Sequence, residues 1–263
     1  MLADATGDPE LRWSARTAFD FSIWLVGDLA RAQRMNAEQI ALAEVDPALG
    51  IATLGISTAD SLWHRAVILT DLGRFEDAAA AFQSAEDRAR RFGENEMASW
   101  IDSMRVRTLA RAGDISGALS MARRAIESGE KIGSVLCRVL PHAAYGMACV
   151  GAQQWQSARE SLDFALELGR SKQAGLFLEP YYVAALAEAH LGLGDEPRAR
   201  QLAEAAHEIA LRAQMLVAEV RALLARARVL LTLDGVSARA EVESILDRAL
   251  ALVRSTGARS YEP

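Results

Sequence analysis

The chain has 263 residues, of which 51 % are hydrophobic and 24 % charged, and its mean hydropathy is +0.05. This composition is typical of one or two compact globular domains or of one elongated repeat array. The formal net charge is −6 and the charges are interleaved, which argues against a nucleic-acid partner and against a polybasic membrane arm. No apolar run approaches the ~20 residues of a membrane-spanning helix, and residues 1–10, "MLADATGDPE", do not resemble a signal peptide.

Alanine, leucine, arginine and glutamate dominate, with single Gly and Pro residues between long helical stretches, so we predict an all-α fold. In chain order, the expected helix pairs are 11–26 with 28–44, 58–72 with 75–91, 95–112 with 115–131, 136–152 with 155–170, 179–193 with 196–211, and 216–232 with 238–255. Residues 45–57 form the one clear insertion. Its apolar residues Ile51, Leu54 and Ile56 favour a packed segment over a free linker.

The helix pairs form an internal repeat. In each pair, a turn residue is followed five positions later by an alanine, and successive turn residues are 46, 40, 40, 41 and 41 positions apart. The turn residues are Gly27, Gly73, Gly113, Gln153, Gly194 and Gly235, and the alanines are Ala32, Ala78, Ala118, Ala158, Ala199 and Ala240. Glycine ends a helix at φ > 0 with little steric cost, and alanine lets the returning helix pack closely. A single hairpin cannot bury its apolar faces, so neighbouring hairpins must stack into one domain over residues 1–263.

The second unit carries the clearest form of this pattern, in Trp63, Ala66, Leu69, Gly73, Ala78, Phe82 and Ala85. It resembles the tetratricopeptide repeat. The resemblance implies a right-handed α-solenoid of about six antiparallel hairpins, at about 11–44, 58–91, 95–131, 136–170, 179–211 and 216–255. The period of 40–41 exceeds the 34 residues of that family, which implies longer helices.

A finer resemblance rests on residues 186–206, "LAEAHLGLGDEPRARQLAEAA", and on residues 227–263. Both look like the C-terminal repeat region of large bacterial, often actinobacterial, proteins. Those proteins join a class III adenylate/guanylate cyclase domain, or a transcription-factor domain, to an ATPase module. The resemblance implies a regulatory or partner-binding segment without that chemistry. Glu262 and Pro263 repeat the helix start at Glu179 and Pro180, so we expect a seventh unit to begin there and the chain to be truncated at that end.

No constellation for catalysis or metal binding emerges. The sequence has no Gly-x-x-x-x-Gly-Lys-Ser/Thr phosphate loop. None of the four histidines has another three or four positions away, so no helix presents a zinc-ligand pair, and each is expected to be packed or hydrogen-bonded. Cys137 and Cys149 are expected to lie ~18 Å apart on one helix as free thiols, which fits the cytoplasm. We therefore predict a protein that is not an enzyme and has no cofactor or metal.

A binding surface is expected instead on the concave face, which the first helix of each hairpin lines in tetratricopeptide arrays. Counting back from the turn residues selects Trp63, Val67, Asp71, Trp100, Arg107, Arg111, Met147, Tyr181 and Glu188. Aromatic and arginine side chains are the types that anchor peptides. In the alternative interpretation, the same side chains simply pack against the neighbouring hairpin.

Three functions remain open from the sequence. The first is a non-catalytic scaffold that binds a protein segment, or neighbouring domains of its parent chain, and Trp100→Ala or Arg107→Ala should weaken that binding. The second is a sensor that closes around a small metabolite or nucleotide. The third is an enzyme with a site in the concave groove. Self-association through the terminal hairpins is also open, because end repeats need polar caps.

Overall fold

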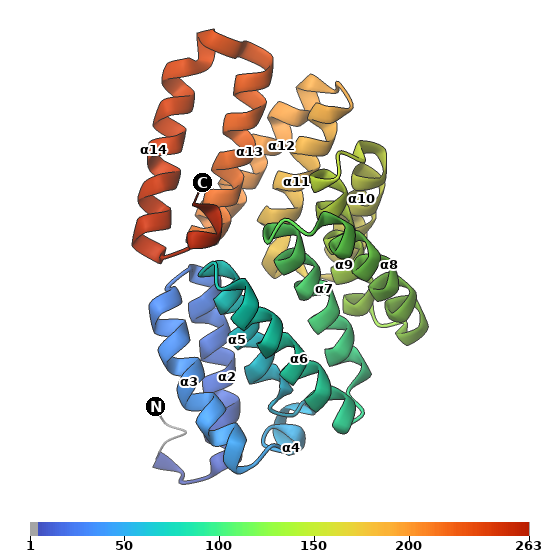
Figure 1. Ribbon diagram of the computed structural model, residues 1–263, viewed down its shortest axis with the longest axis vertical. Coiled ribbons are helices and arrows are strands. Elements are labelled where there is room, and N and C mark those ends of the chain that lie inside the picture. Colours follow the sequence, from blue (N-terminus) through green and yellow to red (C-terminus); the bar gives the residue numbers. More distant parts are fainter. Residues whose placement is uncertain (1–4, 263) are drawn as a thin grey trace.

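The computed structural model describes residues 5–262, and within that range it contains helices and no strand (Figure 1). The helices form six antiparallel hairpins: α2 (Pro9–Val26) with α3 (Leu29–Val45), α5 (Ala59–Asp71) with α6 (Phe75–Arg91), α7 (Asn95–Arg111) with α8 (Ile115–Ile132), α9 (Val135–Gly151) with α10 (Trp155–Lys172), α11 (Glu179–Gly192) with α12 (Glu196–Arg212), and α13 (Leu216–Asp234) with α14 (Arg239–Thr256). The predicted all-α solenoid is confirmed. None of these helices combines the length and the apolar composition that a membrane span requires.

The turn residues act as the repeat suggested, up to the last unit. Gly73 ends its helix with φ +74°, and Gln153 takes the same left-handed conformation at φ +57° without being glycine. In the first five units, the alanine five positions after the turn is fully buried. The last unit departs, because Gly235 starts the short 3-10 helix η2 (Gly235–Ala238). This turn shifts the register, so Ala238 is buried there and the expected contact residue Ala240 is exposed.

The insertion contains one short helix, α4 (Ile51–Leu54), which lies beside α2. The expectation that its apolar side chains pack was wrong for Ile51 and Leu54, which are 40 % and 46 % exposed. Ile56 does pack against the core, Leu49 is buried, and an added Cβ at Gly50 would lie 2.2 Å from Cζ3 of Trp13 in α2. The segment is also held against α2 by hydrogen bonds, since Glu10 accepts from the backbone N–H of Gly50 at 2.8 Å and from the Thr53 hydroxyl at 3.1 Å.

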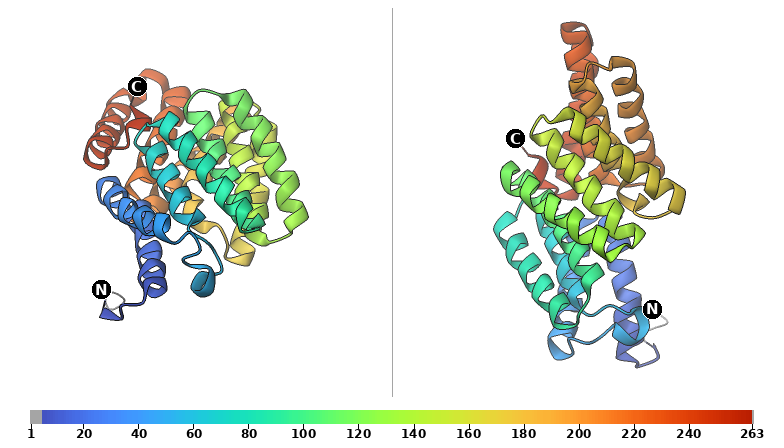
Figure 2. Two further views of the ribbon diagram at one scale, coloured as in Figure 1. Left: turned by 60° about the horizontal axis from the view of Figure 1, so that its bottom comes forward. Right: turned by 90° about the vertical axis from the view of Figure 1, so that its right-hand side faces the viewer.

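The first helices form the inside of the superhelix and the second helices its outside (Figures 1 and 2). In α11, every residue from Pro180 to Ala189 is buried, as expected for a helix covered on all sides. In α8, by contrast, only Ala118, Ala122, Ala125 and Gly129 are buried, which is one face.

The array curls until its two ends meet. An added Cβ at Gly27, in the first hairpin, would lie 3.1 Å from Cβ of Leu216 in the sixth. After α14, the 3-10 helix η3 (Arg259–Tyr261) contacts α5, with Arg259 beside the turn at Gly73. In Figure 1 the red end of the chain accordingly sits directly above the blue and cyan hairpins. The expected start of a seventh unit falls partly on Pro263, which lies outside the described residues.

Candidate functional site

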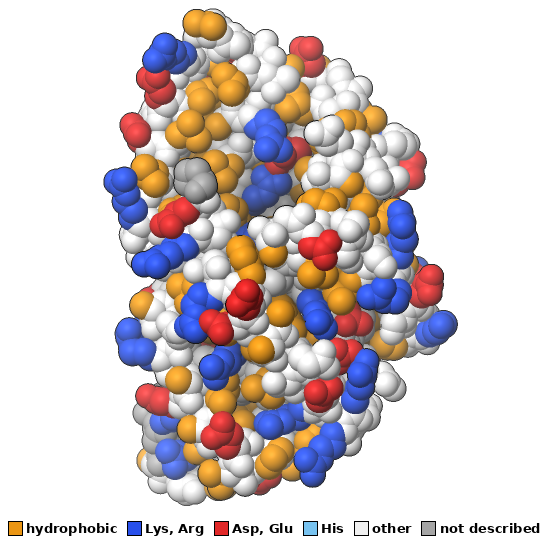
Figure 3. Space-filling model, viewed as in Figure 1, with side chains coloured by type: hydrophobic (Ala, Val, Ile, Leu, Met, Phe, Trp, Pro, Cys, Tyr) orange, Lys and Arg blue, Asp and Glu red, His pale blue; other side chains and the backbone are white. Residues whose placement is uncertain are grey.

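An inner chamber of about 720 Å³ lies within the curl. Its walls come from the C-terminal turns of α7 and α9, from α11 and α13, and from η3. The space-filling view shows basic side chains in the hollow below the last hairpin (Figure 3). Residues from four hairpins thus meet around one space, although they are up to about 150 positions apart in the sequence, as Arg111 and Tyr261 are.

One side of the inner chamber is organised by the buried carboxylate of Asp71. It accepts hydrogen bonds from Nε1 of Trp24 at 2.8 Å and from Nη1 of Arg111 at 2.6 Å, and Nη2 of Arg107 lies 3.4 Å away. The Arg107 guanidinium also lies 5.7 Å from the ring centre of Tyr181, within cation–π range. Burial, together with the neighbouring Tyr261 and Asp71, raises the pKa of the Tyr181 hydroxyl, so this group stays protonated and neutral.

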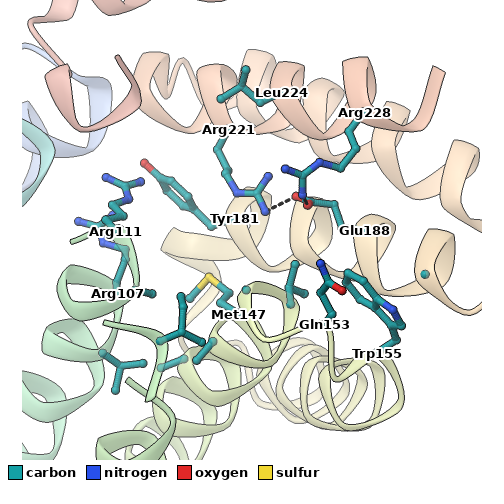
Figure 4. Close-up of a pocket in the computed structure, with 18 of the residues that line it drawn as sticks. Arg107, Arg111, Met147, Gln153, Trp155, Tyr181, Glu188, Arg221, Leu224 and Arg228 are labelled. Carbon is teal, nitrogen blue, oxygen red and sulfur yellow. Dashed lines mark hydrogen bonds and ion pairs between the residues drawn. The ribbon is translucent and has the colours of Figure 1, made fainter. Parts of the chain in front are cut away.

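The other side is organised by Glu188, whose carboxylate is 3 % exposed (Figure 4). It forms ion pairs with Arg221 and with Arg228, both from α13. The side chain of Arg228 is 63 % exposed, so it lies at the edge of the chamber, whereas that of Arg221 is 23 % exposed. Met147, Leu224 and the indole of Trp155 add apolar surface around this pair.

The charges around the chamber do not cancel. Four arginines, Arg107, Arg111, Arg221 and Arg228, face two carboxylates, Asp71 and Glu188, which leaves two positive charges in excess. The chain as a whole has a net charge of −6. An anionic group would therefore be attracted into this chamber against the overall charge of the protein. Among the described residues, no group of three His, Cys, Asp or Glu side chains could hold a metal ion.

The predicted surface residues divide into three sets. Arg107, Arg111, Met147, Tyr181 and Glu188 line the inner chamber. Trp63 and Trp100 line a separate cavity of about 230 Å³. Val67 and Asp71 are buried, at 1 % and 0 % exposure, and line neither space. Counting back from the turn residues selects one face of each first helix. It does not specify how far each side chain on that face is buried when the whole array curls.

Several lining residues were missed from the sequence. Arg221 and Arg228 are seven positions apart on the first helix of the last hairpin, a spacing that places both on one face and could have identified them. Trp155 is the first residue of α10, the second helix of its hairpin, and Ser260 and Tyr261 follow the last hairpin. None of the three therefore belongs to the expected concave face.

The expected packing of the histidines agrees with the structure. Each has a ring nitrogen within 4.0 Å of a carboxylate oxygen: His64 with Asp20 and Asp60, His142 with Glu130, His190 with Asp195, and His207 with Glu219. Cys137 and Cys149 are both free and buried.

Comparison with known proteins identifies the fold. No family model matches the chain, and no curated protein matches it. Among solved structures, a Rap protein complexed with competence and sporulation factor superposes with a TM-score of 0.66 at 11 % identity, covering 95 % of this chain and 73 % of that one. The apo form of RapI gives 0.60 at 11 % identity, covering 93 % and 84 %. BtubC from P. vanneervenii gives 0.54 at 18 % identity, covering 90 % and 92 %. At these identities the likeness shows a shared fold, the tetratricopeptide-like helical repeat.

Proposed function

We propose that this chain is a non-catalytic binding module whose inner chamber takes an extended, acidic segment of a partner protein or of a neighbouring domain. The observation that carries the proposal is the excess of arginine over carboxylate in a chamber built from several hairpins. The Rap protein that shares this fold is complexed with competence and sporulation factor, which is consistent with a ligand held by such an array.

The two arginine pairs would play different roles. Arg107 and Arg111 are fixed by a fully buried carboxylate, so they supply a constant positive field. Arg228 is largely exposed, and Glu188 also pairs with Arg221, so Arg228 can turn to a partner carboxylate while Glu188 keeps a cation beside it. Arginine can bind such a carboxylate through two parallel hydrogen bonds. Apolar side chains of the segment would contact Met147 and Leu224.

We further propose that the module belongs to a larger bacterial signalling protein with a cyclase or ATPase domain and acts in the cytoplasm. This proposal is supported by the resemblance of residues 186–206 and 227–263 and by the free thiols of Cys137 and Cys149. The open reading frame around this segment tests it. A frame with neither domain would contradict the parent assignment and leave the chamber proposal intact.

The chamber proposal is tested by selecting dodecapeptides from a random library on the purified chain and measuring their Kd by fluorescence anisotropy. We expect the recovered peptides to be acidic, and we expect Arg228→Ala and Arg221→Ala each to raise Kd about tenfold or more. Hydrogen bonds to charged groups are worth roughly 1.5–3 kcal/mol, and about 1.4 kcal/mol is a factor of ten.

Arg239→Ala is the matched control, because Arg239 is also an exposed arginine paired with a glutamate, Glu243, but lies on the outer helix α14. It should leave Kd unchanged. Peptides that bind equally well to the Arg228 and Arg239 variants, or a selection that yields no acidic preference, would contradict the proposal.

A further inference from the structure

A second cavity lies at the other end of the inner helices. It has a volume of about 230 Å³, and its walls come from α2, α5, α7, α9 and the 3-10 helix η1 (Leu176–Leu178). Four aromatic side chains surround it: Phe21, Trp63, Trp100 and Phe177. The ring of Phe21 is the centre of this group, 6.2 Å from that of Trp63 and 5.3 Å from that of Phe177. None of the residues around this aromatic cavity also lines the inner chamber.

Ionisable groups lie just beneath the surface on one side of the aromatic cavity. Asp60 and His64 line it, and Asp20 lies behind them, with exposures of 5 %, 4 % and 1 %. Nδ1 of His64 lies 3.6 Å from Oδ2 of Asp60 and 3.7 Å from Oδ2 of Asp20. The amide of Asn36 donates a hydrogen bond to Oδ2 of Asp20 at 3.1 Å. Within the described part of the chain, Oδ2 of Asp60 and Nδ1 of His64 have no hydrogen-bond partner.

The charges in this wall are unbalanced. Two carboxyl groups face one imidazole, so a protonated His64 can balance only one of them in the ionised form. Glu94, which accepts hydrogen bonds from Ser57 just before α5, adds to the negative field, and burial, Asp20 and Glu94 raise the pKa of Asp60 against the effect of His64. A buried carboxylate without a cation is unfavourable, because it has lost its hydration without gaining a partner.

An organic cation satisfies both features of the cavity. The faces of tryptophan and phenylalanine rings attract ammonium groups, by about 2 kcal/mol or more in a desolvated site. The unpaired carboxylate behind them supplies the counter-charge. We propose that the aromatic cavity is a binding site for an alkylammonium group, from either a small free amine or a lysine side chain. This site is independent of the inner chamber and of the acidic segment proposed for it.

Choline and its uncharged carbon isostere, 3,3-dimethylbutan-1-ol, are a direct test. The two have nearly the same shape, so a difference between them measures the contribution of the positive charge. Titration of the purified chain, followed by tryptophan fluorescence and by calorimetry, should show choline binding about tenfold more tightly or better. Equal affinity would show that the cavity recognises only apolar volume, and no binding of choline would equally overturn the proposal.

Variants locate the effect. Asp60→Asn preserves the shape of the side chain and should weaken choline binding about tenfold while leaving the alcohol unaffected. Phe177→Leu should weaken choline binding several-fold, and Phe164→Leu is its matched control, because Phe164 is a similarly half-buried phenylalanine on α10 outside the cavity. Circular dichroism checks that each variant is folded. If Asp60→Asn does not fold, the comparison of choline with its isostere on the unmodified chain still decides.

A second pair of probes distinguishes the sources of the cation. Nα-acetyl-lysine methylamide is compared with Nα-acetyl-norleucine methylamide, which lacks the ammonium group. A preference for the lysine compound that exceeds the preference for choline assigns the site to a peptide side chain, and the reverse assigns it to a free amine. Absence of any charge preference in both pairs would overturn the proposal.

Discussion

At Asp71, a single buried carboxylate pairs with two arginines and accepts a hydrogen bond from an indole N–H. Asp71 is fully buried, and Arg107 is 9 % exposed. Aspartate at this position therefore has a structural role beneath the inner chamber, where it orients the side chains that a ligand would meet. Removing one partner of a buried ion pair leaves the other charges uncompensated, which is far more costly than losing an exposed pair.

Asp71→Asn should lower the free energy of unfolding by about 3–5 kcal/mol, measured by urea denaturation. Asp77→Asn is the control, since Asp77 is 54 % exposed and pairs with Arg74 on the surface. Its effect should stay below about 1 kcal/mol. Equal effects of the two substitutions would show that Asp71 is hydrated in solution.

Asp102, on the half-buried side of α7, makes stability depend on pH. Burial, reinforced by Glu86, raises the pKa of this carboxyl from 3.8 to about 6, although Arg105 lies nearby. The folded chain therefore binds more protons than the unfolded chain between about pH 4 and 6, so this group lowers stability as the pH rises through that range.

Asp102→Asn should consequently stabilise the chain by about 1–2 kcal/mol at pH 7.5 and have little effect at pH 4. Urea unfolding of both proteins at the two pH values measures the difference. A gain that is the same at both pH values would contradict the raised pKa.

At the scale of the element, the residue at the end of an inner helix limits how closely the neighbouring helix can pack against it. Gly151 and Gly192 are each the last residue of an inner helix. An added Cβ at Gly192 would lie 2.2 Å from Cδ2 of the Trp155 indole, whereas at Gly151 it would lie 3.0 Å from the flexible Cδ1 of Ile115. The first contact is with a rigid ring and the second with the movable end of a side chain.

Gly192→Ala should therefore lower the free energy of unfolding by about 1–2 kcal/mol, because the overpacking exceeds the gain in helix propensity. Gly151→Ala should change it by less than about 1 kcal/mol, because the two effects nearly cancel. Thermal denaturation of both variants measures this. A stabilised Gly192 variant would show that Trp155 moves freely.

At the scale of the whole molecule, contact between the ends distinguishes this array from an open solenoid, in which each repeat contacts only its neighbours. The closing contacts involve η3. The Tyr261 ring lies 4.2 Å from the Arg111 guanidinium, which also donates hydrogen bonds to the Tyr261 hydroxyl and, at 2.9 Å, to Oγ of Ser260. Ala258, just before η3, is fully buried.

Tyr261→Ala should release this closure, so the backbone amides of residues 261 and 262 should exchange hydrogen about tenfold faster or more. These amides are bonded to Ala258 and Arg259 within η3, and that turn depends on the contact with Arg111. Hydrogen exchange followed by mass spectrometry measures the change. Ser260→Ala, which removes only one hydrogen bond, should have a smaller effect. Unchanged exchange in Tyr261→Ala would show that η3 is stable by itself.

The sequence alone determined the helices, their pairing and the repeat period. These features depend on local requirements: a left-handed turn conformation as at Gly73 or Gln153, and a small side chain such as Ala78 where two helices touch. Such requirements recur at a fixed spacing, so they can be recognised without knowing the fold. The spacing between the turn residue and the buried alanine changes only in the last unit, where η2 shifts the register.

Only the tertiary structure decided how the inner face is used. It separates Trp63 and Trp100 from Arg107 and Tyr181, places Asp71 beneath the surface, and brings Tyr261 onto Arg111. The physical reason is that the curvature of a solenoid is the sum of small rotations between successive hairpins. No single repeat encodes that sum, so neither the depth of a position nor the meeting of the two ends can be read from the spacing of residues.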